Sequence, residues 1–384
     1  MDIPDKFAPA EALLHEAASR MAGGLTDFGD PGYLAGLRVL LAAMDDDIDF
    51  SDFGRQYAFG DIVDSLAGRL YAEQGFKEHP AALTRPIRRP VIITGVPRTG
   101  TTALQKLMSL DPQFQGLEMW LTDAPMVRPP RDSWESYPQF QAMVARLKTY
   151  FDSMPEQKAA HLMVSDEVDE CLRVMRQDFC SNHWGSSYPV ADYDAWWLAQ
   201  SEAPSYSRFY KVMQLIGADD DRTWLLKNPG HIYQLPLVME LFPDACIIQT
   251  HRHPARAIPS LCNLLLVLHS SLSRTPIDPS VDGRRELRVY SEYVRRAMKA
   301  RESIPSSQVM DVDHRRFHQE PLAVIEEVYA RFGLTLLPEV KRRMELWVNS
   351  DPLGKQGGYT LEKFGLSEAL ISEHFGEYIA RFKL

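Results

Sequence analysis

The chain has 384 residues, a formal net charge of −10 and a hydrophobic content of 45%. A chain of this length can form one large α/β domain with elaborations or two domains, and its acidic balance argues against nucleic acid as a general partner. Any anionic ligand must therefore be held by locally placed cations and not by the field of the whole molecule.

The N-terminal residues lack the basic segment and apolar core of a signal peptide. The longest apolar run, near Leu261–Leu268, is too short to span a bilayer and is interrupted by Asn263. The four cysteines show neither C-x-x-C nor zinc spacing. We therefore expect a cytoplasmic protein with reduced thiols and without a transmembrane segment.

From about Pro9 to Pro80 the sequence is typical of helices, since apolar residues such as Leu13, Ala17 and Met21 recur at helical spacing. This pattern predicts a helical N-terminal cap over residues 1–85. The cap is expected to pack on the core, and whether it also covers the active site or forms the face of a homodimer stays open.

The most informative stretch is Val91–Thr102. A β-branched run beginning at Val91 predicts a buried strand, Gly95 begins a loop of small and rigid residues, and a helical pattern begins at Ala103. A strand, a glycine loop and a helix N-terminus together form a common site for phosphate or sulfate. The alternative is a simple turn with a helix cap, but the three features agree with one another and favour anion binding.

Two glycines of this loop, Gly95 and Gly100, have the spacing of a Walker A motif. The residue after Gly100 is Thr101 where that motif has lysine, and a cation stands earlier, at Arg98. We therefore expect an anion site that differs from a standard ATP-binding loop.

Residues from about 123 to 210 resemble an insertion into the core. An acidic stretch at Asp166–Glu170 lacks the ligand order of a calcium loop, and acidic residues at a helix start are favoured by the helix dipole, so we expect a helix start there and no metal site. The insertion is also rich in aromatic residues, which indicate either an apolar acceptor pocket or a plain core: Trp184, Tyr188, Tyr193, Trp196, Trp197 and Tyr206.

Two further strands, at 224–227 and 245–250, each end near a cation, Lys227 and Arg252. A helix is predicted between them, which implies parallel strands joined by a right-handed crossover. Ligands of such sheets bind at the carboxyl ends of the strands, so Arg98, Lys227 and Arg252 are expected to converge there. Neither the lysine of the P-loop nor a metal-holding aspartate at a strand end is present, which favours a donor that needs cations but no metal.

The loop Pro97-Arg98-Thr99-Gly100-Thr101-Thr102 resembles the 5′-phosphosulfate loop of sulfotransferases, P-[KR]-[ST]-G-[ST]-[TS]. Arg252, followed eight residues later by Ser260, resembles their 3′-phosphate motif, although His253 and Arg256 depart from the usual Asn or Asp and from Asp. The Lys-x-Pro at Lys227 also matches. Together these elements resemble bacterial sulfotransferases that use 3′-phosphoadenylyl sulfate (PAPS).

The resemblance implies an α/β fold, a three-layer α/β/α sandwich with a central parallel sheet like that of P-loop NTPases. The core would span residues 86–335, and residues 336–384 would form a helical tail and a loop that covers the cofactor. Within that late loop, Gly357, Gly358 and Tyr359 are expected as cofactor contacts, although the usual basic run is missing.

The implied reaction is in-line transfer of a sulfuryl group from PAPS to a hydroxyl or amine of a small molecule, lipid or glycan, with 3′-phosphoadenosine 5′-phosphate (PAP) as the product. The loop residues from Gly95 to Thr102 would bind the phosphosulfate and Arg252 and Ser260 the 3′-phosphate. Arg98 and Lys227 would neutralise developing charge. The proton of the acceptor would go to Glu118, twenty residues after Arg98, or to His231.

Two other classes of function stay open at this level. One is a divergent P-loop nucleotide kinase, which would depend on ATP and Mg²⁺. The other is a non-catalytic nucleotide-binding protein, in which the N-terminal helices and the aromatic insertion would bind a partner.

Overall fold

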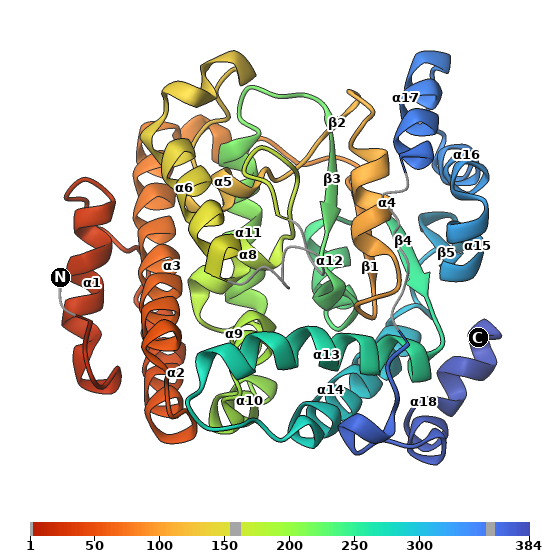
Figure 1. Cartoon of the computed structure of the whole chain (residues 1–384). Coiled ribbons are helices and arrows are strands. Elements are labelled where there is room, and N and C mark those ends of the chain that lie inside the picture. The colour runs from red at the N-terminus through yellow and green to blue at the C-terminus, as the bar shows by residue number, and fades with distance from the viewer. Residues whose placement is uncertain (1–2, 154–162, 351–357) are drawn as a thin grey trace. The chain divides into compact units, whose positions relative to one another are not determined.

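The computed structural model describes residues 3–153, 163–350 and 358–384 (Figure 1). The chain divides into two compact units. The helical unit comprises Met1–Pro86, Leu117–Asp221 and Leu264–Ile277, and the sheet unit comprises Ile87–Gly116, Arg222–Asn263 and Asp278–Leu384. The expected cap at 1–85 and most of the expected insertion thus fall in one unit, and the C-terminal tail falls in the other.

The sheet unit contains a five-stranded sheet in the order β2-β3-β1-β4-β5 (Figure 1). All its strand pairs are parallel, which confirms the predicted α/β class. The strands are β1 (Val91–Gly95), β2 (Phe114–Gln115), β3 (Thr223–Lys227), β4 (Cys246–His251) and β5 (Val309–Asp313).

Both faces of this sheet are buried, as parallel sheets require. Val91 and Ile93 of β1 point to one face and pack in a core cluster with apolar residues of α4, α16 and α17. Ile92 points to the opposite face and is also buried. The helices of the unit are α4 (Thr101–Met108), α12 (Leu235–Leu241), α14 (Pro279–Ala300), α15 (His314–Gln319), α16 (Pro321–Phe332), α17 (Pro338–Asn349) and α18 (Glu368–Phe382).

The helical unit is built around three N-terminal helices and a set of shorter ones. The third N-terminal helix begins at a Ser51 cap, whose side chain accepts a hydrogen bond from the Gly54 amide at 2.9 Å. The helices are α1 (Glu11–Met21), α2 (Tyr33–Asp47), α3 (Asp52–Glu78), α5 (Met119–Asp123), α6 (Pro138–Ser153), α8 (Leu172–Met175), α9 (Asn182–Ser187), α10 (Ala191–Leu198) and α11 (Ala203–Ile216).

A further helix, α13 (Pro254–Leu272), begins in the sheet unit and ends in the helical unit. By length and composition it could cross a membrane, but more than half of its most apolar stretch is buried within the structure. Buried core helices pass the same test, so this is weak evidence for a membrane span. All four cysteines are free and buried.

The structure differs from the sequence prediction at one acidic stretch. The acidic stretch Asp166–Glu170 is not the start of a helix: it forms a turn and an isolated bridge, and α8 begins only at Leu172. There Asp166 pairs with Arg131 at 2.7 Å.

The aromatic residues of the insertion pack the interior of the helical unit. All but Trp196 are buried. Trp184 stacks on Phe179 and on Tyr188, with ring centroids 5.0 and 6.1 Å apart. For these side chains the structure therefore favours the core interpretation over the pocket interpretation.

Candidate functional site

The loop that follows β1 starts at Gly95, and this position accepts only a residue without a side chain. Gly95 has a φ of +145° and pairs in register with Thr250 of β4. A Cβ at Gly95 would lie 2.5 Å from the Thr250 carbonyl oxygen. Glycine is therefore required by both the backbone conformation and the close approach of β4.

The rest of the loop is shaped by left-handed residues and internal hydrogen bonds. Arg98 and Gly100 have φ values of +67° and +95°. The Thr99 hydroxyl bonds the Val96 carbonyl oxygen at 2.6 Å and lies 2.5 Å from the Thr250 hydroxyl. Pro97 precedes the turn, and Thr101 and Thr102 form the first turn of α4. A loop of this kind before a helix N-terminus is suited to an anion.

The cation at the end of β3 lies beside this loop. Ile93 of β1 pairs in register with Lys227. The Lys227 ammonium donates a hydrogen bond to the Thr102 hydroxyl at 3.3 Å, and the residue is only 1% exposed. A buried ammonium next to a phosphate-type loop can stabilise negative charge more strongly than one in water.

Three residues expected to bind the cofactor are linked by hydrogen bonds. Arg252, which follows β4, donates from Nη1 to the Arg98 carbonyl oxygen at 2.9 Å. Arg98 in turn donates from Nε to the hydroxyl of Ser260, on α13, at 3.3 Å. Burial lowers the pKa of both guanidinium groups, and for Arg252 the positive charges of Arg98 and Arg256 lower it further. The site concentrates positive charge, which an anionic ligand would compensate.

The late loop contributes one described residue to this region. Tyr359 lies close enough to Arg98 to interact with its charge. Gly358 is exposed, and no contact with the cations is observed for it. Gly357 lies outside the described residues.

The two candidate bases differ in their surroundings. His231 lies in the short turn Pro229–Ile232, is 1% exposed, and burial lowers its pKa to about 3. Its imidazole is therefore neutral at pH 7 but a weak base.

Glu118 belongs to the helical unit and precedes α5. Arg128 donates to its Oε2 at 3.1 Å and also to Asp220 at 3.0 Å. This hydrogen bond orients the side chain of Glu118, whose other oxygen, Oε1, can accept a further hydrogen bond.

One residue that the sequence analysis did not single out lies next to the cations. His314 directly follows β5, and its ring atom Cδ2 would lie 3.5 Å from a Cβ built on Gly100. Positive charges of Arg252 and Arg98 both act on it. The signal in the sequence was a fourth strand that ends beside a residue able to carry positive charge.

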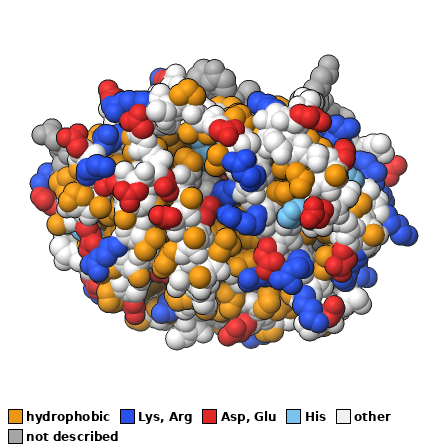
Figure 2. All heavy atoms as spheres, turned by 90° about the horizontal axis from the view of Figure 1, so that it is seen from below, with side chains coloured by type: hydrophobic (Ala, Val, Ile, Leu, Met, Phe, Trp, Pro, Cys, Tyr) orange, Lys and Arg blue, Asp and Glu red, His pale blue; other side chains and the backbone are white. Residues whose placement is uncertain are grey.

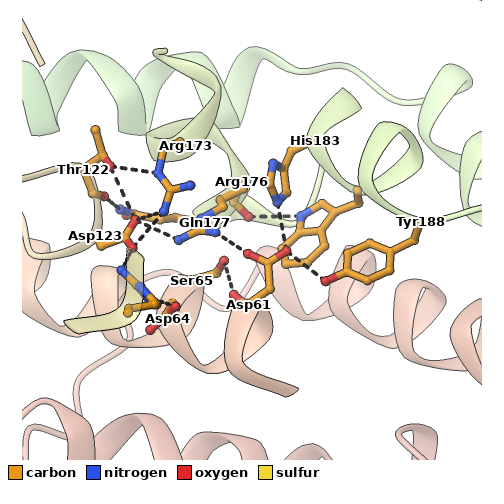
Figure 3. Close-up of polar contacts among 12 residues, drawn as sticks. Asp61, Asp64, Ser65, Thr122, Asp123, Arg173, Arg176, Gln177, His183 and Tyr188 are labelled. Carbon is orange, nitrogen blue, oxygen red and sulfur yellow. Dashed lines mark hydrogen bonds and ion pairs between the residues drawn. The ribbon is translucent and has the colours of Figure 1, made fainter. Parts of the chain in front are cut away.

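A second cluster of arginines lies in the helical unit (Figure 3). Arg176 binds Asp61 and also Asp123, the latter at 2.8 Å, and Arg173 binds Asp123 at 2.9 Å. His183 and Tyr188 each contact the second oxygen of Asp61 at 3.0 Å. Although burial alone would raise it, the charges of His183 and Arg176 hold the pKa of Asp61 below its ordinary value.

The face that Figure 2 presents carries charged side chains of both signs, and several Lys and Arg side chains gather near its centre. This mixture agrees with the net charge of −10 and with an anion site built from a few local cations.

Comparisons with known proteins point to one family. A model described as the sulfotransferase family matches residues 90–339. The chain is 24% identical over 340 residues to the omega-hydroxy-beta-dihydromenaquinone-9 sulfotransferase Stf3 of Mycobacterium tuberculosis and of Mycobacterium bovis, covering 86% of this chain and 84% of the relative.

Solved structures agree with this assignment. The crystal structure of sulfotransferase STF1 from Mycobacterium tuberculosis matches 97% of this chain and 100% of its own, with 32% identity and a TM-score of 0.86. That of sulfotransferase STF9 from Mycobacterium avium matches 100% and 99%, with 25% identity and a TM-score of 0.91. The chain therefore belongs to the sulfotransferase family and is an enzyme that transfers sulfuryl groups.

Proposed function

We propose that this sulfotransferase uses PAPS as its donor and transfers the sulfuryl group to the hydroxyl of an apolar, lipid-like acceptor. The observation that carries the donor is the set of cations after adjacent parallel strands: Arg98 after β1, Lys227 at the end of β3 and Arg252 after β4. Hydroxyl groups and backbone amides accompany them, as an anionic nucleotide requires.

The loop residues from Gly95 to Thr102 would bind the 5′-phosphosulfate through backbone amides and hydroxyls. Arg252 and Ser260 would bind the 3′-phosphate, and their shared link to Arg98 would couple the two ends of the nucleotide. Tyr359 would reach the nucleotide next to Arg98, and Gly358 would stand beside it in the late loop. Cofactor binding is proposed to need no metal ion.

Lys227 and Arg98 would stabilise the transition state of the transfer. A bond forms between the acceptor oxygen and sulfur while the bond between sulfur and the bridging phosphate oxygen breaks, and PAP leaves. Negative charge grows on the bridging oxygen, where a buried ammonium and a guanidinium are most effective. Both groups are already held in position by hydrogen bonds, so little reorganisation is needed.

We assign the proton of the acceptor hydroxyl to Glu118 in preference to His231. An imidazole whose pKa is about 3 competes poorly for a hydroxyl proton. Arg128 holds Glu118 through Oε2, and the other oxygen of this side chain, Oε1, can accept the proton.

The proposed acceptor class rests on the relatives. Stf3 is named for a hydroxyl on a menaquinone, which is a long apolar molecule. By extension, we infer an alcohol on a lipid-like chain for this enzyme. The cytoplasmic location and the homodimer stay predictions, which cell fractionation and light scattering would test.

The donor is tested by titration calorimetry with PAP and, separately, with ATP in the presence and absence of Mg²⁺. We expect metal-independent binding of PAP, weakened about 10- to 100-fold by Arg252→Ala, because a charge-assisted hydrogen bond is worth about 1.5–3 kcal/mol. Arg343→Ala, at an exposed arginine of α17, is the matched control and should bind like the wild type. Mg²⁺-dependent ATP binding without PAP binding would instead support the kinase alternative.

The acceptor is tested by transfer of radiolabelled sulfate from PAPS to a long-chain isoprenoid alcohol. The same chain without its hydroxyl and a short water-soluble alcohol serve as matched acceptors. Transfer that requires both the hydroxyl and the long chain is expected. Equal transfer to the short alcohol would contradict the lipid-like class while leaving the donor intact.

A further inference from the structure

The carboxyl end of β5 lies beside that of β4 in the sheet unit. The two strands are parallel, and His251 pairs in register with Asp313. The next residues, Arg252 and His314, therefore leave the sheet side by side. This adjacency follows from the strand register alone and does not depend on any side-chain conformation.

Two histidines share the side of α15 that lies near the loop. His314 and His318 are one helical turn apart, and their ring centroids are 4.3 Å apart. His314 is 6% exposed, and His318 is partly buried. The His314 ring lies near the anion loop, since a Cβ built on Gly100 would be 3.5 Å from its Cδ2 atom.

The charges around the pair are mostly positive. Arg252, after β4, acts on both histidines, and Arg98 of the loop acts on His314. The nearby carboxylate of Asp313 is itself bound by Arg315 at 2.6 Å.

On the side of α16, Glu327 is bound by Arg316. Glu326 of the same helix is bound by Lys341 at 2.5 Å, and Glu320, between α15 and α16, lies 3.8 Å from Arg316. Each of these acidic groups therefore has a basic partner.

In the absence of an anion, both imidazoles are held neutral. Burial, followed by the charges of Arg252 and His318, lowers the pKa of His314 to about 3. Burial, followed by the charge of Arg252, lowers that of His318. A phosphate dianion bound at Arg252 would cancel the repulsion and add an attractive charge and a hydrogen-bond acceptor.

We propose that His314 and His318 are additional ligands of the cofactor's 3′-phosphate, and that the pair takes up a proton from solvent when this phosphate binds beside Arg252. This inference rests on the proposed PAPS donor. The protonated imidazole donates a charge-assisted hydrogen bond to a phosphate oxygen. Cofactor affinity then depends on pH through this pair, and PAP release returns the proton to solvent.

Calorimetry of PAP binding in several buffers measures this proton directly. The observed enthalpy changes linearly with the ionisation enthalpy of the buffer, and the slope counts the protons taken up. At about pH 7 we expect the wild type to take up about 0.5–1 proton more than His314→Gln or His318→Gln. Proton exchange by the nucleotide's own phosphates is common to all three proteins and cancels in the difference.

The pH dependence of affinity provides a second readout. Between about pH 6.5 and 8, the PAP affinity of the wild type should fall about three- to tenfold more than that of either variant. His374→Gln carries the same change at an exposed site on α18 and should behave like the wild type. If His314→Gln does not fold, His318→Gln carries the test, because His318 is less buried.

The outcomes separate the two proposals. PAP binding with the same proton count in the wild type and in both histidine variants would overturn the role of the histidines while leaving the donor intact. No PAP binding by folded wild type would overturn the donor, and the histidine proposal with it. A proton count that falls only in the histidine variants would support both.

Discussion

Three arginines of the helical unit are matched by three aspartates. Arg146, Arg173 and Arg176 bind the carboxylates of Asp61, Asp64 and Asp123. Figure 3 shows Arg173 and Arg176 beside these aspartates. Two arginines beside the loop of the sheet unit make different hydrogen bonds: Arg98 donates to a serine hydroxyl and Arg252 to a backbone carbonyl. Among the described residues, Arg98 has no carboxylate partner.

The comparison shows that the partner of a buried arginine indicates its role. Carboxylates neutralise the first cluster, so its charges hold the helices together and leave little for a ligand. The neutral acceptor of Arg98 orients this guanidinium without cancelling its charge, which leaves that charge for an anion. Composition alone could not separate the two, because both consist of arginines.

The largest loss of stability is expected from a substitution in the cluster of Arg146, Arg173 and Arg176. Arg176→Met removes a guanidinium from two buried aspartates and should lower the free energy of unfolding by about 3–5 kcal/mol, because the carboxylates lose their partner. Urea unfolding measures the loss. PAP affinity of the folded variant should be unchanged, and a loss of PAP binding without a loss of stability would contradict the structural role.

For Lys227 we expect a large loss of activity and little change in stability. Lys227→Met removes a buried charge next to the loop and should lower kcat about 10²- to 10³-fold, because one transition-state donor is lost. The unfolding free energy should change little or rise, since methionine packs well without a desolvated charge. Initial-rate kinetics measure the effect, with Lys211→Met at an exposed site on α11 as the control. Normal kcat would remove Lys227 from catalysis.

Glu118 is an intermediate case, since it is paired with an arginine yet proposed as the base. Glu118→Gln keeps the shape of the side chain but cannot accept a proton, and we expect kcat to fall about 10²-fold or more. KM for PAPS should stay near the wild-type value. A fall in stability with kcat of the folded fraction preserved would instead make Glu118 a purely structural partner of Arg128.

The smallest expected effect is the contribution of His231 to the pH dependence of the free energy of unfolding. Its folded pKa of about 3 lies below its ordinary value of 6.5, so between these values the unfolded state binds more protons. The unfolding free energy should therefore fall as pH drops below 6.5, by about 1 kcal/mol over the first pH unit from this residue.

His231→Gln removes this contribution, so its unfolding free energy should depend less on pH than that of the wild type in the same range. Thermal or urea unfolding at several pH values measures the difference. Identical pH dependence in the two proteins would show that His231 is not buried in its neutral form.

The sequence alone indicated the candidate anion site. The strand and the two glycines of the loop were singled out because loops of this kind have strict local requirements, and Arg98, Lys227 and Arg252 because they lie at or after the ends of predicted strands. The structure shows one such requirement at Gly95, where Thr250 leaves no space for a Cβ. Parallel strands also bring their carboxyl ends to one edge by topology, so the convergence of cations could be expected without coordinates.

The tertiary structure alone decided which polar residues share a partner and which aromatic residues are core. Asp61 and Arg176 are far apart in the sequence, and only the packing of α3 against the segment after α8 joins them. Likewise, His314 becomes relevant only through the register of β5 with β4. Local patterns report backbone requirements, whereas charge balance and burial depend on contacts between distant segments.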